Sequence, residues 1–353
     1  MQRYERHISA AATIVGAVFD QIFFARVDLV RTHYAFLTYV AVCFVSIPVL
    51  HWIEARAERG IPRPRFRAVF PIATQFALGG FWSGFLVFYG RSAVISASWP
   101  FLLVLVAMFF GNEILKKYHE RLVFTSVLFF FALYSYAIFA IPLLTGTMGT
   151  WVFLLSGAVA IVVFWAFVLV LRFVARERFR ADVWRIRAGA LFVLGLINLF
   201  YFTNILPPLP LSAKAAGIYH SVWRVPGDYL ATAETDRSLL DRYLGLAPTM
   251  HVVSGESLYA YSEIFAPTTL STTIVHRWQW YDPSAKKWVT KTAITYPIVG
   301  GRDGGYRGYS ATLAQPGKWR VNVETIGGLL IARIPFTVEE VQLPPPEETI
   351  NLD

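Results

Sequence analysis

The chain has 353 residues, of which 56% are hydrophobic and only 16% are charged, and its mean hydropathy is +0.49. These values exclude an ordinary soluble globular protein. The formal net charge of +9 is compatible with nucleic-acid binding, but half of the lysines and arginines, 16 of 32, lie in short loops between apolar stretches, so we exclude a nucleic-acid partner. The single cysteine, Cys43, excludes an intramolecular disulfide.

Apolar stretches long enough for a helix to cross a bilayer recur throughout residues 1–206. A first one, Ile8–Ala25, is short and contains Asp20 and Gln21, so it either spans the bilayer or lies in its interface. Six others are clear: Tyr34–Ile53, Val69–Tyr89, Ser92–Phe110, Leu122–Leu144, Trp151–Leu171 and Ala188–Leu206. We therefore predict a membrane α-helical bundle of six or seven transmembrane helices, surrounded by lipid.

The basic residues of the connecting loops predict the orientation of this bundle, because cytoplasmic loops are enriched in lysine and arginine. With the N-terminus inside, the cytoplasmic pieces hold 16 Lys/Arg and the outer pieces hold 3. The cytoplasmic pieces are residues 1–7, 54–68, 111–121 and 172–187, and the outer pieces are 26–33, 90–91 and 145–150. We expect the C-terminal domain to lie outside the cytoplasm, which means in the periplasm if the chain is an inner-membrane protein of a Gram-negative bacterium.

Few polar side chains lie inside the predicted spans, and each is a candidate for function. They are Asp20, Gln75, Asn198 and Asn204. The bundle lacks the chain of acids and histidines that a proton-driven pump needs. The pair Gly80–Gly84 is typical of close helix packing, either within the bundle or between subunits of a homo-oligomer.

The chain changes character after Leu206. Prolines at 207, 208 and 210 end the last span, and we predict a juxtamembrane linker, helical in part, over residues 207–247. Residues 248–340 then follow a period-two pattern typical of strands, and residues 341–353 form an acidic tail that we expect to be disordered. The expected strands are 257–264, 271–281, 287–297, 306–313, 318–325 and 329–338, which indicates an all-β, immunoglobulin-like sandwich.

Two of these strands alternate strictly, so their two faces can be assigned. In the first, Ile274, His276, Trp278 and Trp280 share one face, and Arg277 and Gln279 lie on the other. In the second, Trp319, Val321 and Val323 point inward, and Arg320, Asn322 and Glu324 point outward.

The domain also carries a spaced set of glycine, arginine and tryptophan residues. The set comprises His276–Trp278, Gly300–Arg302, Gly305–Arg307, Ser310 and Gly317–Val321. Over roughly residues 255–340 it resembles the exported domain of an uncharacterised bacterial family, domain of unknown function 2914. The resemblance implies a Gram-negative envelope protein and brings no known activity with it.

The most unusual segment is Gly300–Ser310, which is rich in glycine and arginine. Backbone amides near Gly301 and Gly304 are open to a ligand there, and the guanidinium groups of Arg302 and Arg307 suit a carboxylate or phosphate. His276, Tyr306 and Tyr309 can add hydrogen bonds and stacking. The alternative is structural, because glycines form turns and either arginine can pair with an acid such as Asp303 or Glu263.

We predict neither catalytic residues nor a metal or cofactor site, because the segment lacks the strand–turn–helix context of a nucleotide loop and no nucleophile motif surrounds Ser310. The leading hypothesis is a non-enzymatic envelope protein that presents a periplasmic β-sandwich to a protein partner or to an anionic or glycan ligand. The alternative is a transporter or lipid-handling protein in which this domain is an accessory.

Overall fold

The computed structural model describes residues 30–115, 118, 121–235, 247–267, 270–299 and 305–352. The chain divides into a helical unit, which ends at Pro210, and a β unit, which begins at Leu211 and also includes Ser92–Val94. The predicted segment Ile8–Ala25, with Asp20, lies outside the described residues. Residues 300–304 of the glycine-rich segment, which include Arg302, also lie outside them.

The helical unit contains six helices that are long and apolar enough to cross a membrane among the described residues. They are α2 (Val30–Ala57), α3 (Val69–Ser92), α4 (Ile95–Ile114), α5 (Leu122–Thr145), α6 (Thr150–Val174) and α7 (Arg176–Phe202), with the 3₁₀ helix η1 (Arg65–Ala68) before α3. Six helices were therefore predicted correctly. The bounds Ala188–Leu206 are wrong for the last helix, because α7 starts immediately after a break at Ala175 and takes up the arginine-rich segment, whose residues favour helix.

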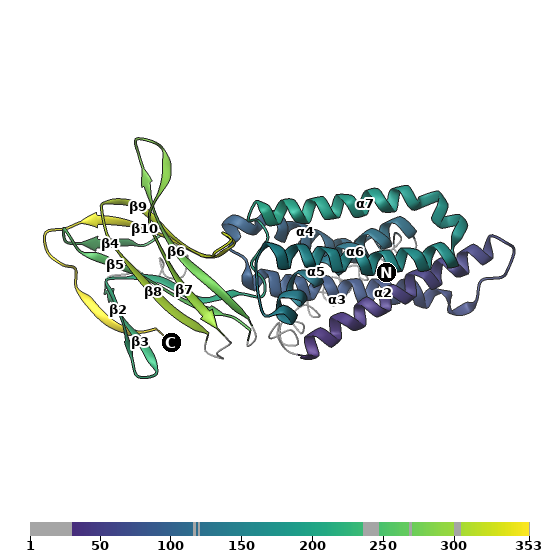
Figure 1. Cartoon of the computed structure of the whole chain (residues 1–353), viewed down its shortest axis with the longest axis horizontal. Coiled ribbons are helices and arrows are strands. Elements are labelled where there is room, and N and C mark those ends of the chain that lie inside the picture. The colour runs from purple at the N-terminus through teal and green to yellow at the C-terminus, as the bar shows by residue number, and fades with distance from the viewer. Residues whose placement is uncertain are drawn as a thin grey trace, which may run out of the picture. The chain divides into compact units, whose positions relative to one another are not determined.

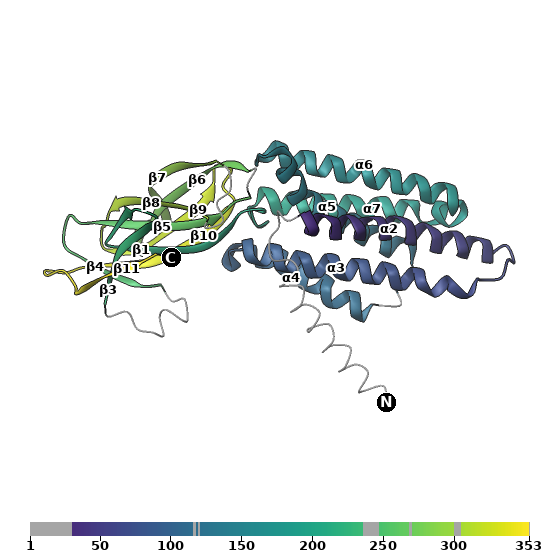
Figure 2. The same ribbon diagram turned by 90° about the horizontal axis from the view of Figure 1, so that it is seen from below.

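Helix α5 lies at the centre of this unit, in contact with α2, α6 and α7 (Figures 1 and 2). Most of its residues are buried. Aromatic rings fill the interior: Phe36 of α2 stacks on Phe85 of α3 and on Tyr136 of α5, with ring centroids 5.4 and 5.3 Å apart. Gly80 of α3 makes room for the ring of Tyr39, which an added Cβ would meet at 2.4 Å. The predicted close packing at Gly80 thus occurs within the bundle.

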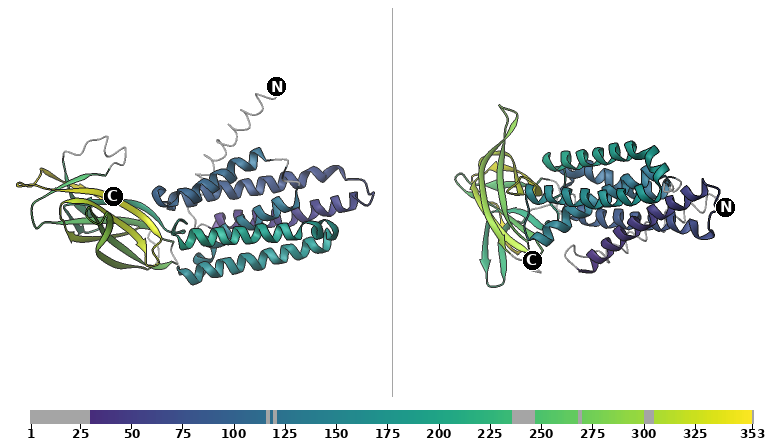
Figure 3. Two further views of the ribbon diagram at one scale, coloured as in Figure 1. Left: turned by 90° about the horizontal axis from the view of Figure 1, so that it is seen from above. Right: turned by 45° about the vertical axis from the view of Figure 1, so that its right-hand side comes forward.

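The β unit contains eleven strands among the described residues (Figures 1 and 3). They are β1 (Ser212–Tyr219), β2 (Ser221–Val225), β3 (Asp228–Glu234), β4 (Thr249–Val252), β5 (Ser257–Phe265), β6 (Ser271–Asp282), β7 (Lys287–Val299), β8 (Tyr306–Leu313), β9 (Gly317–Thr325), β10 (Leu330–Glu340) and β11 (Glu347–Asn351). All six predicted strands are present, with ends that differ by at most two residues.

These strands form three sheets, with the orders β4-β10-β9-β6-β7, β1-β5-β8 and β11-β3-β2. The five-stranded sheet and the β1-β5-β8 sheet face each other as a β-sandwich, because β6 side chains bond to side chains of β5 and β8. Trp278, Trp319 and Phe336 pack in its core, the last two with stacked rings. The β11-β3-β2 sheet covers the other face of β1-β5-β8, where Tyr229 contacts Tyr261 and Tyr309.

Two predictions about the ends of this unit are wrong. The described residues of the predicted linker 207–247 form β1, β2 and β3, whereas 236–246 lie outside the described residues, and the predicted disordered tail contains β11. β1 pairs with β5, and β11 pairs with β3. Most of β1 and β11 lacks the β-branched and aromatic alternation that marks a strand by itself, so pairing with a partner strand decides their structure.

The burial of Leu352 leads to a prediction about the tail. Leu352 is 6% exposed and packs against Val222, Ala231 and Tyr261. Leu352→Ala should lower the local opening free energy of β2 and β3 by about 2 kcal/mol, as for other leucines truncated in a core. Amide hydrogen exchange in the full-length protein measures this change. Leu343→Ala, at a position that is 80% exposed, should have no effect, and equal results for both variants would contradict a docked tail.

Candidate functional site

The structure encloses Arg307 between two sheets. Its side chain leaves β8 on the face covered by the β11-β3-β2 sheet, and Nη1 donates a 2.8 Å hydrogen bond to Asp228 at the start of β3. Nε lies 3.8 Å from a carboxylate oxygen of Glu263, on β5. The Arg307 side chain is 21% exposed. These carboxylate partners agree with the alternative in which the arginine pairs with an acid and stabilises the fold. Gly301, Arg302 and Gly304 lie outside the described residues.

His276 lies on the opposite side of the β1-β5-β8 sheet from Arg307. It is fully buried, and its Nε2 and Nδ1 atoms lie 2.8 and 2.9 Å from the hydroxyls of Ser262 and Ser310. Ser310 and Arg307 are three positions apart on β8, so their side chains point to opposite faces. If the segment binds an anion, we expect His276 or Tyr306 beside Arg307 on an exposed face, but His276 is buried on the other side of the sheet. Tyr306 is partly buried, and Tyr309, on the Arg307 face, is 43% exposed.

Burial lowers the pKa of His276 to about 4. The imidazole is therefore neutral at neutral pH, with one nitrogen donating to a serine hydroxyl and the other accepting from one. The hydroxyl of Ser310 also accepts from Trp278 Nε1 at 3.0 Å, and the hydroxyl of Ser262 lies 2.8 Å from that of Tyr296. These bonds join the two sheets through a satisfied polar network.

The outer face of the five-stranded sheet is the more open candidate site, and we call it the arginine face. It consists of outward side chains from four adjacent strands: Arg277 and Gln279 of β6, Trp288 of β7, Arg320, Asn322 and Glu324 of β9, and Arg333 of β10. The register places Arg277 opposite Asn322, Gln279 opposite Arg320, and Asn322 opposite Arg333. Three arginines and one glutamate thus lie together among the described residues.

Hydrogen bonds along this face hold the arginines in place. Gln279 Oε1 accepts from Arg320 Nε at 2.8 Å and from Asn322 Nδ2 at 3.3 Å. Asn322 Oδ1 accepts from Arg333 Nε at 2.9 Å, and Arg277 Nε donates to Glu324. Amide oxygens thus orient the guanidinium groups of Arg320 and Arg333.

The charges on the arginine face lie close enough to affect one another. Burial, together with the charge of Arg333, lowers the pKa of Arg320. Burial also lowers the pKa of Arg333, although the charge of Glu324 acts in the opposite direction. A negatively charged ligand bound here would reduce this repulsion.

An aromatic ring completes the arginine face at its β7 edge. The guanidinium of Arg320 lies 4.3 Å from the centroid of the Trp288 ring, a distance typical of a cation–π contact. Tyr281 packs edge-on against the same ring, with centroids 5.4 Å apart. The strand alternation had indicated the outward positions of β6 and β9, but Trp288 and Arg333 were missed because β7 and β10 were not assigned faces.

The polar residues of the predicted spans do not gather at one place among the described residues. Asn112 Nδ2 donates to the Gln75 carbonyl at 3.1 Å, which joins α3 and α4. Asn198 Nδ2 donates to the Tyr134 hydroxyl at 3.2 Å, which joins α5 and α7. Asn204 follows the end of α7 with a φ of 56°. Gln75 and Asn198 therefore serve separate helix contacts.

Two further histidines of the β unit share a carboxylate. Glu234 Oε1 and Oε2 lie 2.9 Å from nitrogens of His220 and His251. Burial raises the pKa of Glu234, but the hydrogen bonds from both histidines outweigh it, and the pKa is lowered to about 2. Within the described part of the chain, no group of three or more His, Cys, Asp or Glu side chains is placed to hold a metal ion.

Comparison with known proteins finds a family match for part of the β unit and shows no activity. Residues 271–338 match the family described as "Protein of unknown function (DUF2914)", which confirms the resemblance over this stretch. No curated protein matches the chain. The β unit is therefore described as a β-sandwich domain of unknown function.

Solved structures of three kinds are similar to parts of the chain. The first is an immunoglobulin-like protein from Pseudomonas aeruginosa, with 12% identity over 37% of this chain and 98% of that one and a TM-score of 0.20. The second is a beta-glucosidase from Listeria innocua, with 15% identity over 34% of this chain and 17% of that one and a TM-score of 0.21. The third is an alkylpurine DNA glycosylase from Pseudomonas fluorescens, with 11% identity over 88% of this chain and 82% of that one and a TM-score of 0.20. At these TM-scores the likenesses carry no argument about function.

The lowered pKa of His276 predicts a pH dependence for the sandwich. In the unfolded chain the imidazole takes up its proton near pH 6.5, whereas in the folded protein it does so only near pH 4. Stability should therefore be constant above pH 6.5 and fall by up to about 3 kcal/mol as the pH decreases toward 4. Amide hydrogen exchange of β5, β6 and β8, corrected for the intrinsic rate, measures this loss. His276→Gln should remove the dependence, and a flat profile in the unmodified protein would contradict the buried network.

Proposed function

We propose that this chain is a non-enzymatic membrane protein of a bacterial envelope, whose helical unit anchors a β domain that binds an acidic glycan on the periplasmic side. The observation that carries the proposal is the arginine face, with three oriented guanidinium groups and one carboxylate among its described residues. The six apolar helices support the anchor by their length and composition.

The distribution of basic residues supports the orientation. The α2–α3 and α6–α7 connections lie at the same end of the helical unit, since Arg59 of the first pairs with Glu177 at the start of α7. Residues 54–68 and 172–187, which form this end, contain eleven arginines and four carboxylates. Under the positive-inside rule this end is cytoplasmic. A single helix, α7, leads from this end to Phe202, so the β domain follows on the opposite side of the membrane.

The chemistry of the arginine face favours an acidic glycan over an uncharged one. Guanidinium groups bind carboxylates through two parallel hydrogen bonds, and the partly exposed Gln279 amide beside Arg320 suits a sugar hydroxyl. The Trp288 ring adds an aromatic surface at the edge. Arg302 and Tyr309 remain predicted ligand residues of a second surface. Experiment must distinguish an acidic glycan from a protein partner.

The proposed orientation predicts which positions are accessible from outside the cell. In a chain with Cys43 replaced by serine, Ser284→Cys on the exposed β6–β7 turn should react with a membrane-impermeant maleimide in spheroplasts. Ile61→Cys, between α2 and η1 and 41% exposed, should react only after the membrane is opened. The reverse pattern would contradict the orientation.

The proposed ligand class predicts a measurable role for individual arginines. Full-length protein in neutral detergent should bind oligogalacturonate, and calorimetric titration should show an affinity at least about tenfold lower for Arg320→Gln, since one charged bidentate contact is lost. Arg320→Lys should also bind more weakly, because lysine lacks the planar fork, and added salt should weaken binding in the unmodified protein.

Lys287→Gln provides the matched control. It removes one positive charge from the exposed start of β7, at a register position opposite Asp282 and off the arginine face. An equal loss in Lys287→Gln and Arg320→Gln would mean that binding depends on overall charge alone. The absence of binding in the unmodified protein would reject an acidic glycan ligand and leave a protein partner as the hypothesis. Of the residues on which the transporter alternative depends, Gln75 and Asn198 serve separate helix contacts.

A further inference from the structure

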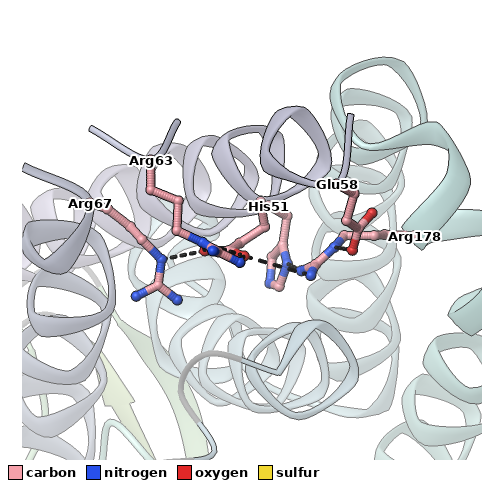
Figure 4. A network of polar contacts seen from close by, with 6 residues as sticks. His51, Glu58, Arg63, Arg67 and Arg178 are labelled. Carbon is pink, nitrogen blue, oxygen red and sulfur yellow. Dashed lines mark hydrogen bonds and ion pairs between the residues drawn. The ribbon is translucent and has the colours of Figure 1, made fainter. Parts of the chain in front are cut away.

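A second polar cluster lies at the arginine-rich end of the helical unit (Figure 4). Glu54 of α2 is 5% exposed and accepts hydrogen bonds from two arginines of the α2–α3 connection. Arg63 donates to both carboxylate oxygens, with Nη2 at 2.9 Å, and Arg67 donates through Nε. Arg178 of α7 approaches the same carboxylate, with Nη2 at 3.8 Å from Oε2. One buried carboxylate therefore gathers three guanidinium groups.

His51 lies between the two sides of this cluster and has an unsatisfied nitrogen. The residue is 1% exposed, and its Nδ1 lies 3.4 Å from Arg178 Nη1. A guanidinium group only donates hydrogen bonds, so Nδ1 must be the acceptor and Nε2 must carry the proton. Nε2 is buried and has no hydrogen-bond partner among the described residues. Such a buried donor needs an acceptor, and the described residues do not supply one.

The charges around His51 show which acceptor fits. Arg63, Arg67 and Arg178 face Glu54 and Glu58, and Glu58 is occupied by Arg178 Nε at 2.7 Å. The cluster thus carries one more positive than negative charge. A third carboxylate would match this excess charge, but a phosphate offers more acceptor oxygens to donors that come from different directions.

From this arrangement we propose that the cluster of His51, Arg63, Arg67 and Arg178 binds a phosphate group, with His51 Nε2–H and the arginines as donors. Glu54 is a positioning residue, which holds Arg63 and Arg67 in place. The phosphate comes either from an anionic phospholipid head group, as basic pockets at the cytoplasmic ends of membrane helices bind, or from free phosphate. The lipid source rests on membrane insertion of the helices, whereas the free-phosphate source does not.

Native mass spectrometry of the full-length protein, released from neutral detergent, separates the two sources. One arm contains dioleoyl phosphatidylglycerol and the other contains inorganic phosphate. We expect one tightly retained phosphate-bearing molecule per chain in one arm or in both. Retention of phosphatidylglycerol alone identifies the lipid, and retention of phosphate alone identifies the free anion. Retention in neither arm would overturn the proposal.

Variants test whether this cluster is the site. Arg178→Gln and His51→Phe should each lower the affinity for the retained molecule at least about tenfold, and Arg178→Lys, which keeps the charge and loses the fork, should give a smaller loss. Circular dichroism of each variant reports whether the helices are intact, and Arg178→Lys provides a measurement if Arg178→Gln does not fold.

Arg185→Gln is the matched control. Arg185 belongs to the same basic helix start, pairs with Asp182 and has a side chain that is 74% exposed. Its replacement should change the affinity less than about twofold, since it removes the same charge outside the cluster. An equal loss for Arg185→Gln and Arg178→Gln would show a diffuse attraction to the basic surface and would overturn the proposal.

Discussion

The hydrogen bonds of His276 are the constraint on which the organisation of the β unit depends. Both ring nitrogens bond to serines of the opposing sheet, so β6 has one orientation relative to β5 and β8. Because side chains alternate along a strand, a shift by one residue would place Arg277 in the core and His276 outside. The buried imidazole therefore determines that Arg277 and Gln279 point outward, where they join Arg320 and Asn322 on the arginine face.

The surroundings of each arginine distinguish a structural role from a binding role. Arg307 meets the carboxylates of Asp228 and Glu263 between two sheets, which satisfies its charge internally. On the arginine face, Gln279 and Asn322 orient Arg320 and Arg333 through neutral amide oxygens. Such bonds fix the direction of a guanidinium group and, unlike bonds from a carboxylate, bring no negative charge to it. The same chain thus uses arginine in two ways within one domain.

How far the sequence predicted this structure depended on how strongly each segment carried its own signal. The alternation of Trp278 and Trp319 with polar neighbours placed β6 and β9 and their faces correctly. β1 consists largely of alanine and glycine, and β11 begins with glutamates, so both become strands only through their partners. The pairing of Arg307 with Glu263 was one of the alternatives, but its hydrogen bond to Asp228 was hidden, because Asp228 lies 79 residues away in the chain. Local patterns predicted the outward residues of β6 and β9, whereas contacts between residues far apart in the chain decided that Arg307 is enclosed.

The central claim is that the arginine face is where the β domain binds its ligand. Hydrogen–deuterium exchange of the full-length protein, with and without saturating oligogalacturonate, tests this claim most directly. We expect the ligand to slow exchange in β6, β9 and β10 and to leave β1, β5 and β8 unchanged. Protection confined to residues 300–310 would contradict the account, because it would place the ligand on the glycine-rich segment and make the arginine face part of the architecture alone.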